Sequence, residues 1–178
     1  HFWIYRDVEF VRPLYHSLVC KAADFMVKFR DGETHLPSPS YDLWEERRGV
    51  LAFTTSAVWA GLTAASRFTT AFGDRTASEK YRVAALEVRD GAEAVLYRPE
   101  LSRFVRMANQ KPDGSWEVDA TLDASLFGLW YFGMFSPEDS RVIKTMQAIR
   151  DRLWIKTDVG GVARYENDYY HQQSQDLS

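Results

Sequence analysis

Residues 54–72 read TTSAVWAGLTAASRFTTAF, and this stretch decides the fold. Thr54 or Thr55 can cap the start of a helix, and Gly73 stands just past its end, where a left-handed residue commonly closes a helix. Small side chains recur within it at Ala57, Ala60, Gly61, Ala64 and Ala65. This composition lets a neighbouring helix approach closely, so the stretch predicts one member of a tightly packed helix pair.

The residues before this segment predict another helix and a long loop. Apolar side chains recur every three or four positions over residues 10–29, with Asp7 as the N-cap. Pro13 falls early in that helix, where a missing N–H is tolerated. Residues 33–51 contain prolines and glycines without a clear period, so we expect a loop, and loops of that length are often functional.

Three further helices are predicted after residue 73. Thr76 and Glu79 form a capping-box pattern for a helix that runs to about residue 96, which Gly91 weakens locally. The short aromatic segment 124–135 is apolar nearly all round, which indicates a buried helix. Residues 140–153 carry their apolar side chains on one face and predict an amphipathic helix.

The connections between these helices suggest the architecture. Residues 104–107 and 116–118 predict two short strands around a turn, which lies in one of the long connections. Short turns alternate with long, elaborate loops, as in helical hairpins whose loops gather at one rim. The pattern therefore predicts an all-α fold, part of an α/α toroid with small β-hairpins in the long loops, and about five helices in one domain over residues 1–178.

Composition excludes several classes of function. The net charge is −3 with acidic and basic residues interspersed, which argues against a nucleic-acid partner. No apolar stretch approaches the length that spans a membrane. The four histidines, His1, His16, His35 and His171, are scattered without ligand spacing, which argues against a zinc site. We expect no cofactor, and metal dependence is left open. Both ends of the chain read as cuts through a longer protein.

Residues 40–47, SYDLWEER, carry the first chemical signal. Trp44 stands directly before the paired carboxylates Glu45 and Glu46, with Arg47 behind them. A carboxyl group against an indole is partly desolvated, which favours its neutral form and suits a proton donor for glycosidic-bond cleavage. We therefore expect Glu45 to act as a general acid. The simpler alternative is a solvent-exposed acidic pair at a helix start.

Residues 164–170, RYENDYY, form the second cluster. One cation, several acceptors and three phenols fit the hydroxyl rows and apolar C–H faces of a sugar. Its alternative is a polar loop whose tyrosines pack on the scaffold. Asp119 and Asp123 bracket a helix start, and capping is their expected role.

Together these motifs resemble glycoside hydrolase family fifteen, the glucoamylases and glucodextranases. The resemblance rests on residues 41–47 with Phe53-Thr54-Thr55, on residues 118–126, and on residues 164–170, and it follows the bacterial and archaeal branch. It covers essentially the whole chain. In the fungal branch a proline follows the Arg-Tyr pair, whereas Glu166 follows it here, so contacts past Tyr165 are less closely matched.

The resemblance implies an (α/α)6 toroid and an inverting, exo-acting hydrolase that releases glucose from non-reducing ends of α-glucans or oligosaccharides. By position, Glu45 matches the general acid, Glu46 a substrate-contacting carboxylate and Trp44 an aromatic of the cleft. Arg164 and Asp168, with Tyr165 between them, match substrate-binding loop residues. The general base and the early segment that grips the terminal glucose would lie outside this chain, so the chain resembles the middle of a catalytic module.

Several alternatives remain open from the sequence. The parent protein could instead cleave trehalose or dextran, and linkage preference among α-1,4, α-1,6 and α,α-1,1 bonds is undecided. A helical sugar-binding module without chemistry is a further possibility. We expect the isolated chain to be inactive, to need the remainder of the module as its partner, and to self-associate through apolar helix faces such as residues 126–135.

Overall fold

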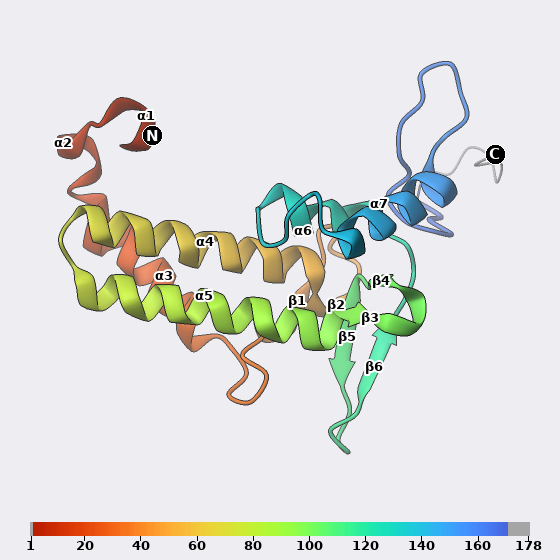
Figure 1. Cartoon of the computed structure of the whole chain (residues 1–178), viewed down its shortest axis with the longest axis horizontal. Helices are drawn as coiled ribbons and strands as arrows, with labels where there is room; N and C mark the ends of the chain where they lie inside the picture. The colour runs from red at the N-terminus through yellow and green to blue at the C-terminus, as the bar shows by residue number, and fades with distance from the viewer. Residues whose placement is uncertain (1, 171–178) are drawn as a thin grey trace.

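The computed structural model describes residues 2–170, so the two chain ends, His1 and residues 171–178, lie outside the described residues. The central scaffold of the fold is a long antiparallel helical hairpin, made of α4 (Ala52–Ala71) and α5 (Arg75–Leu96). Figure 1 shows the two helices side by side along the longest axis of the molecule. Gly73 closes the hairpin with φ of 81°, as the sequence predicts.

The caps of this hairpin differ from the predicted ones. Helix α4 begins at Ala52 after Leu51, which makes no side-chain cap, and Thr55 is fully buried one turn inside the helix. Helix α5 is capped by Asp74, whose carboxylate accepts a hydrogen bond from the Ala77 N–H at 3.0 Å. The predicted capping box at Thr76 is therefore wrong by two residues, because an aspartate nearer the turn takes the capping position.

Two glycines in the hairpin let other segments approach it closely. A Cβ atom on Gly61 of α4 would lie 3.0 Å from the end of the Met26 side chain. A Cβ atom on Gly91 of α5 would lie 2.4 Å from the carbonyl oxygen of Thr34. The loop after the first helices thus crosses directly over α5, and Gly91 serves this approach as well as weakening the helix.

The predicted helix over residues 10–29 is wrong as a single element. It is divided into α2 (Val8–Val11), the π-helix η1 (Tyr15–Cys20) and α3 (Lys21–Lys28), preceded by α1 (Phe2–Tyr5). The break falls at Pro13, which has no N–H to donate and whose ring crowds the preceding turn. Asp7 caps α2 as predicted, accepting a hydrogen bond from the Phe10 N–H at 2.9 Å.

Short antiparallel strands lie at one end of the hairpin (Figure 1). One sheet has the order β1-β2-β5-β6, formed by Ser40–Tyr41, Arg48–Leu51, Met107–Gln110 and Trp116–Asp119. The other pairs β3 (Tyr97–Arg98) with β4 (Arg103–Phe104), and the 3-10 turn η2 (Pro99–Leu101) joins them. The predicted 104–107 strand is therefore two strands in different sheets, and the predicted 33–51 loop contains β1 and β2.

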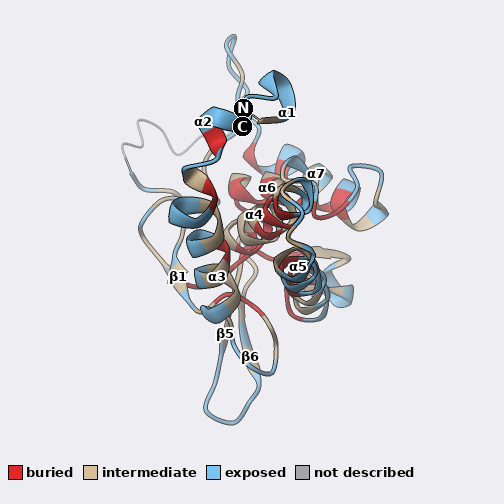
Figure 2. Cartoon of the chain, turned by 90° about the vertical axis from the view of Figure 1, so that its left-hand side faces the viewer, coloured by how far each residue is buried: buried red, intermediate tan, exposed pale blue. Residues whose placement is uncertain are grey.

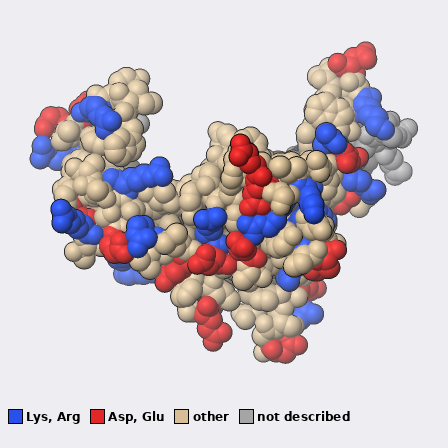
Figure 3. All heavy atoms as spheres, in the orientation of Figure 1, with Lys and Arg blue, Asp and Glu red and all other residues tan. Residues whose placement is uncertain are grey.

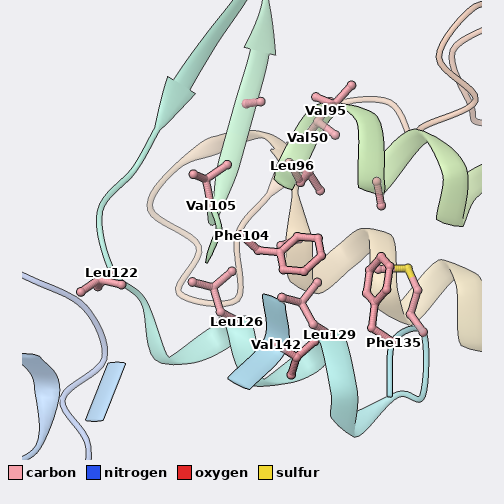
Figure 4. Packing of buried hydrophobic residues seen from close by; sticks show 14 of the residues in the cluster. Val50, Val95, Leu96, Phe104, Val105, Leu122, Leu126, Leu129, Phe135 and Val142 are labelled. Atoms are coloured by element: carbon pink, nitrogen blue, oxygen red, sulfur yellow. The ribbon is translucent and has the colours of Figure 1, made fainter. Parts of the chain in front are cut away.

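Later helices close the core over these strands. The 3-10 turn η3 (Ala124–Phe127) runs into α6 (Gly128–Tyr131), and α7 spans Ser140–Leu153 as predicted. In the end-on view of Figure 2, α4 lies among α3, α5 and α6, and it carries buried residues along its length. Figure 4 shows Phe104, Leu126, Leu129 and Phe135 converging in the main apolar cluster.

The expectation that segment 126–135 leaves apolar surface uncovered holds in part. Leu126, Leu129 and Phe135 are at most 1% exposed and are covered within the chain itself, whereas Trp130 and Tyr131 are 39% and 64% exposed. Further large exposed apolar side chains lie on the first thirty residues, at Trp3, Ile4, Phe10, Leu18, Phe25 and Phe29. On the face drawn in Figure 3, acidic and basic side chains are interspersed. None of the helices within residues 2–170 is both long and apolar enough to cross a membrane.

Candidate active site

The 42–47 loop joins β1 to β2 in a tight turn. The Asp42 N–H donates to the Arg47 carbonyl at 2.8 Å, and the Asp42 carboxylate accepts from the Glu46 N–H at 2.8 Å. The Glu45 N–H donates to the Asp42 carbonyl at 3.1 Å. The N–H, the carbonyl and the carboxylate of Asp42 thus each form a hydrogen bond within the turn. The loop connects two strands of the sheet, whereas the simpler alternative expected it to begin a helix.

Glu45 stands at the tip of this turn with a left-handed backbone, at φ of 60°. A residue with a Cβ in this conformation is uncommon and carries strain of order 1 kcal/mol, which glycine would avoid. Its side chain is exposed in this chain. The indole of Trp44 therefore does not shield the Glu45 carboxylate from water here, in contrast to the shielding that the adjacent positions suggested.

The two neighbours of Glu45 are both anchored inward. The Trp44 indole N–H lies 3.1 and 3.2 Å from the two carboxylate oxygens of Asp123. Glu46 accepts hydrogen bonds from the Tyr165 hydroxyl and from the Arg164 guanidinium, the latter at 3.2 Å. The loop therefore fixes Trp44 and Glu46 and leaves the carboxylate between them facing outward.

Residues 163–170 form the other side of the site. Arg164 holds Asp168 with two hydrogen bonds, at 2.6 and 2.7 Å, and its guanidinium lies over the rings of Trp44, Tyr165 and Tyr170 at 5.0–5.3 Å. The bond from Arg164 is the main reason that the pKa of Asp168 lies below its usual range. Burial, followed by the hydrogen bond to Glu46, raises the pKa of the Tyr165 phenol.

Backbone hydrogen bonds tie this segment to the residues before η3. The Ala124 N–H donates to the Arg164 carbonyl at 2.7 Å, and the Glu166 N–H donates to the Leu122 carbonyl at 3.0 Å. The Leu122 N–H in turn donates to the Glu166 carboxylate at 2.9 Å. Segments far apart in the sequence thus meet: Trp44 and Glu46 come together with Arg164, Tyr165 and Asp168. That these residues bind substrate stays a prediction.

A buried ion network beneath the site was missed by the sequence analysis. Arg106 donates to Asp119 at 2.7 and 3.0 Å and to Asp123 at 3.2 Å, and it lies 5.2 Å from the Tyr165 ring centroid. Burial opposes its charge, but the hydrogen bonds with Asp119 and Asp123 outweigh this and raise the pKa of the guanidinium. The available signal was a lone arginine in the otherwise apolar run Phe104-Val105-Arg106-Met107-Ala108.

Asp123 has the predicted capping role, because it accepts from the Ser125 N–H at 2.7 Å at the start of η3. Asp119 does not cap a helix: it ends β6 and accepts from the Thr121 N–H at 3.0 Å in the turn that follows. Both also neutralise Arg106. Across residues 2–170, no group of three or more His, Cys, Asp or Glu is arranged to hold a metal ion.

Comparison with known proteins gives matches to glycosidases. Over 171 residues the chain is 32% identical to an uncharacterized glycosyl hydrolase of Methanocaldococcus jannaschii, covering 96% of this chain and 26% of that protein. It is 26% identical over 180 residues to a glucoamylase of Clostridium sp. (strain G0005), covering 90% of this chain and 25% of that protein. The chain thus spans about a quarter of the length of these curated relatives.

A solved structure and a family model match as well. The crystal structure of a bacterial glucoamylase complexed with acarbose superposes with a TM-score of 0.74 at 22% identity, covering 91% of this chain and 26% of that one. This likeness confirms the predicted fold class, all-α and part of an (α/α)6 toroid with small β-hairpins. The model of glycosyl hydrolases family 15 matches residues 17–176. The chain therefore belongs to glycosyl hydrolases family 15.

Proposed function

We propose that this chain is the acid-bearing part of a longer, inverting α-glucoside hydrolase, with Glu45 as the general acid. One observation carries the proposal: the 42–47 loop anchors Trp44 and Glu46 inward and holds the intervening Glu45 exposed in a strained backbone conformation. Strain of this kind persists where the surrounding structure enforces it, and it concentrates at functional sites.

In this proposal Glu45 gives its proton to the oxygen of the glycosidic bond as that bond breaks. An inverting reaction then needs a second carboxylate about 6.5–9.5 Å away to activate the attacking water, and we place that base outside this chain. A general acid must also stay protonated near the working pH, which burial favours. We therefore assign the cover over Glu45 to the remainder of the parent module.

The neighbouring network would bind the sugar. Arg164 is 27% exposed and has N–H groups left after pairing with Asp168 and Glu46, so it can donate to sugar hydroxyls. Trp44, Glu46 and Asp168 form a wall of an aromatic face and acceptors beside Glu45. Tyr165, expected from the sequence to bind substrate, is 1% exposed and instead supports this wall from behind by donating its hydroxyl to Glu46. The likeness to a glucoamylase complexed with acarbose supports an α-glucan or oligosaccharide substrate and exo-acting release of glucose.

Two other functions compete with this one. A trehalose- or dextran-cleaving relative would use the same acid on another linkage, and product analysis on maltooligosaccharides, dextran and trehalose separates these substrates. A sugar-binding module without chemistry would have no need of Glu45, and the strained exposed carboxylate favours catalysis over that alternative.

The decisive experiment is Glu45→Gln in the full-length parent, assayed for glucose release from maltooligosaccharides. We expect kcat to fall about 10²–10⁴-fold, the usual contribution of a positioned proton donor. Glu117→Gln, an exposed glutamate on β6, is the matched control and should leave kcat unchanged. Retained activity in Glu45→Gln would refute the acid assignment. The 178-residue chain alone should release no glucose, and turnover at the parent's rate would place the base within it.

A further inference from the structure

Asp123 is bonded more extensively than a helix cap requires. Its side chain is 2% exposed and accepts from the Ser125 N–H at 2.7 Å, which is the capping bond. It also accepts from the Arg106 guanidinium at 3.2 Å and from the Trp44 indole at 3.1 and 3.2 Å. One bond suffices to cap a turn, so the other contacts point to an additional role.

The indole contact connects this buried carboxylate to the tip of the 42–47 loop. Trp44 and Asp123 are 79 positions apart, and the hydrogen bond joins the loop to the start of η3. Over a face of the indole ring, the guanidinium carbon of Arg164 lies 5.2 Å from the Trp44 ring centroid. Trp44 is therefore held by a hydrogen bond at its edge and a cation at its face.

Fixing Trp44 also fixes the residue that follows it. Trp44 and Glu45 share a planar peptide bond, so a rigid Trp44 restricts where the Glu45 backbone can lie. Glu45 itself adopts the strained φ of 60°, a conformation that a loosened loop could relax. Displacement of a reacting group by about 1 Å can cost about 100-fold in rate, so such relaxation would affect catalysis.

We infer that Asp123 is a positioning residue: through the Trp44 indole N–H it holds Glu45 where it can donate its proton. The inference rests on the proposed function of Glu45. Arg106 supports this role by donating a hydrogen bond to Asp123 at 3.2 Å inside the protein, which holds the acceptor in place facing the indole.

A merely structural role for Asp123 makes a different prediction. As a cap and a partner of Arg106, it would affect stability whether or not residue 44 carries an N–H. Asp119 offers a matched comparison, because it pairs with the same Arg106 at 2.7 Å and caps its own turn. Its recorded hydrogen bonds within residues 2–170 go to Arg106 and Thr121 and not to Trp44.

A double-mutant cycle in the full-length parent separates these roles. Trp44→Phe removes the N–H of the indole. Asp123→Asn keeps one carbonyl oxygen that can accept the capping bond, but it replaces the carboxylate that accepts from the indole with a weaker, neutral acceptor. We expect each change to lower kcat about tenfold with KM within about threefold, and the double variant to lower it about tenfold and not a hundredfold. Asp119→Asn should change kcat less than twofold and add independently to Trp44→Phe. Melting temperatures are measured for every variant.

Each outcome decides the inference. Additive losses for Trp44→Phe and Asp123→Asn would mean that Asp123 does not act through the indole. If Asp123→Asn fails to fold, Trp44→Phe alone decides, because a wild-type kcat in that variant overturns the inference. Glu45→Gln is assayed in parallel. If Glu45→Gln loses activity while Trp44→Phe keeps the wild-type kcat, only the positioning role of Asp123 is refuted. If Glu45→Gln stays active, the proposed function itself is refuted.

Discussion

The α4–α5 hairpin and the 42–47 loop are stabilised in opposite ways. Leu62 and Val88 are fully buried where α3, α4 and α5 meet, and small residues let the helices approach. The loop instead relies on hydrogen bonds of Asp42, Trp44 and Glu46, and it contains a strained residue, Glu45. Apolar burial gives the scaffold its stability, whereas polar contacts place the loop at some cost in strain.

The largest effect is expected in the scaffold. Leu62→Ala removes a fully buried side chain and leaves a cavity, so it should lower the free energy of unfolding of the chain by about 2–5 kcal/mol. Chemical denaturation measures this change. Leu86→Ala, on the 44% exposed side of α5, is the matched control and should cost less than about 1 kcal/mol. Equal losses of unfolding free energy in Leu62→Ala and Leu86→Ala would contradict the view that apolar burial stabilises the hairpin.

A smaller effect is expected where the loop meets the 163–170 segment. Asp168→Asn removes the partner of Arg164 and should cost about 1–2 kcal/mol at neutral pH. The control Asp151→Asn, in an exposed pair with Arg150, should cost under about 0.5 kcal/mol.

The pH dependence of that difference gives a second measurement. The folded pKa of Asp168 is lowered, so its stabilisation is fully present above the unfolded value of about 3.9 and is lost as pH falls through the folded pKa. The gap between wild type and Asp168→Asn should therefore close in acid. A gap that stays constant from pH 7 to acid would show that the charge of Asp168 contributes nothing.

Glu45→Gly should raise the free energy of unfolding, whereas Leu62→Ala should lower it. Glycine adopts positive φ without a steric penalty, so we expect the chain to become about 1 kcal/mol more stable, although glycine's larger unfolded-state entropy offsets part of this. Asn167→Gly, also at φ of 60°, is the control and should gain less, because asparagine tolerates this conformation. Calorimetry of both variants tests whether strain is stored at Glu45.

Self-association is the weakest expected effect and reports on the N-terminal apolar surface. Ile4 and Leu18 are 77% and 56% exposed, so the chain should associate through this region at high concentration. Light scattering should show that the double change Ile4→Ser and Leu18→Ser reduces the apparent mass. A monodisperse monomer before any change would contradict the prediction.

The scaffold could be predicted from the sequence because its signals are local. Periodicity placed α5 and α7 within about two residues and the end of α4 within about one. Helix α4 begins three or four residues earlier than the predicted caps Thr54 and Thr55 imply, and the cap at Thr76 was also misassigned. The break at Pro13 was underestimated, because whether a proline interrupts a helix depends on the tertiary contacts available to the next turn. The predicted 116–118 strand is present as β6, which pairs with β5 across the predicted turn. The strands β1, β2 and β3 were missed and β4 and β5 were merged, since segments of two to four residues carry little pattern and depend on their tertiary context.

The site could be predicted only in part. Trp44, Glu46, Arg164, Tyr165 and Asp168 were expected together, and the described contacts join them. The role of Glu45 stays a prediction. The buried Arg106 network could not be predicted from the sequence. Its members come from a strand end and two turns, and no spacing between them shows that their side chains meet inside the protein.

The two close-packed glycines of the hairpin also bear on protein engineering. Replacing helical glycines by alanine is a common route to heat-resistant variants, since alanine favours helix by about 1 kcal/mol. At Gly61 the obstacle is the flexible end of Met26, which can move aside, but at Gly91 it is a backbone carbonyl at 2.4 Å. A rule applied to both positions alike would strengthen the helix at one and dislodge a crossing loop at the other.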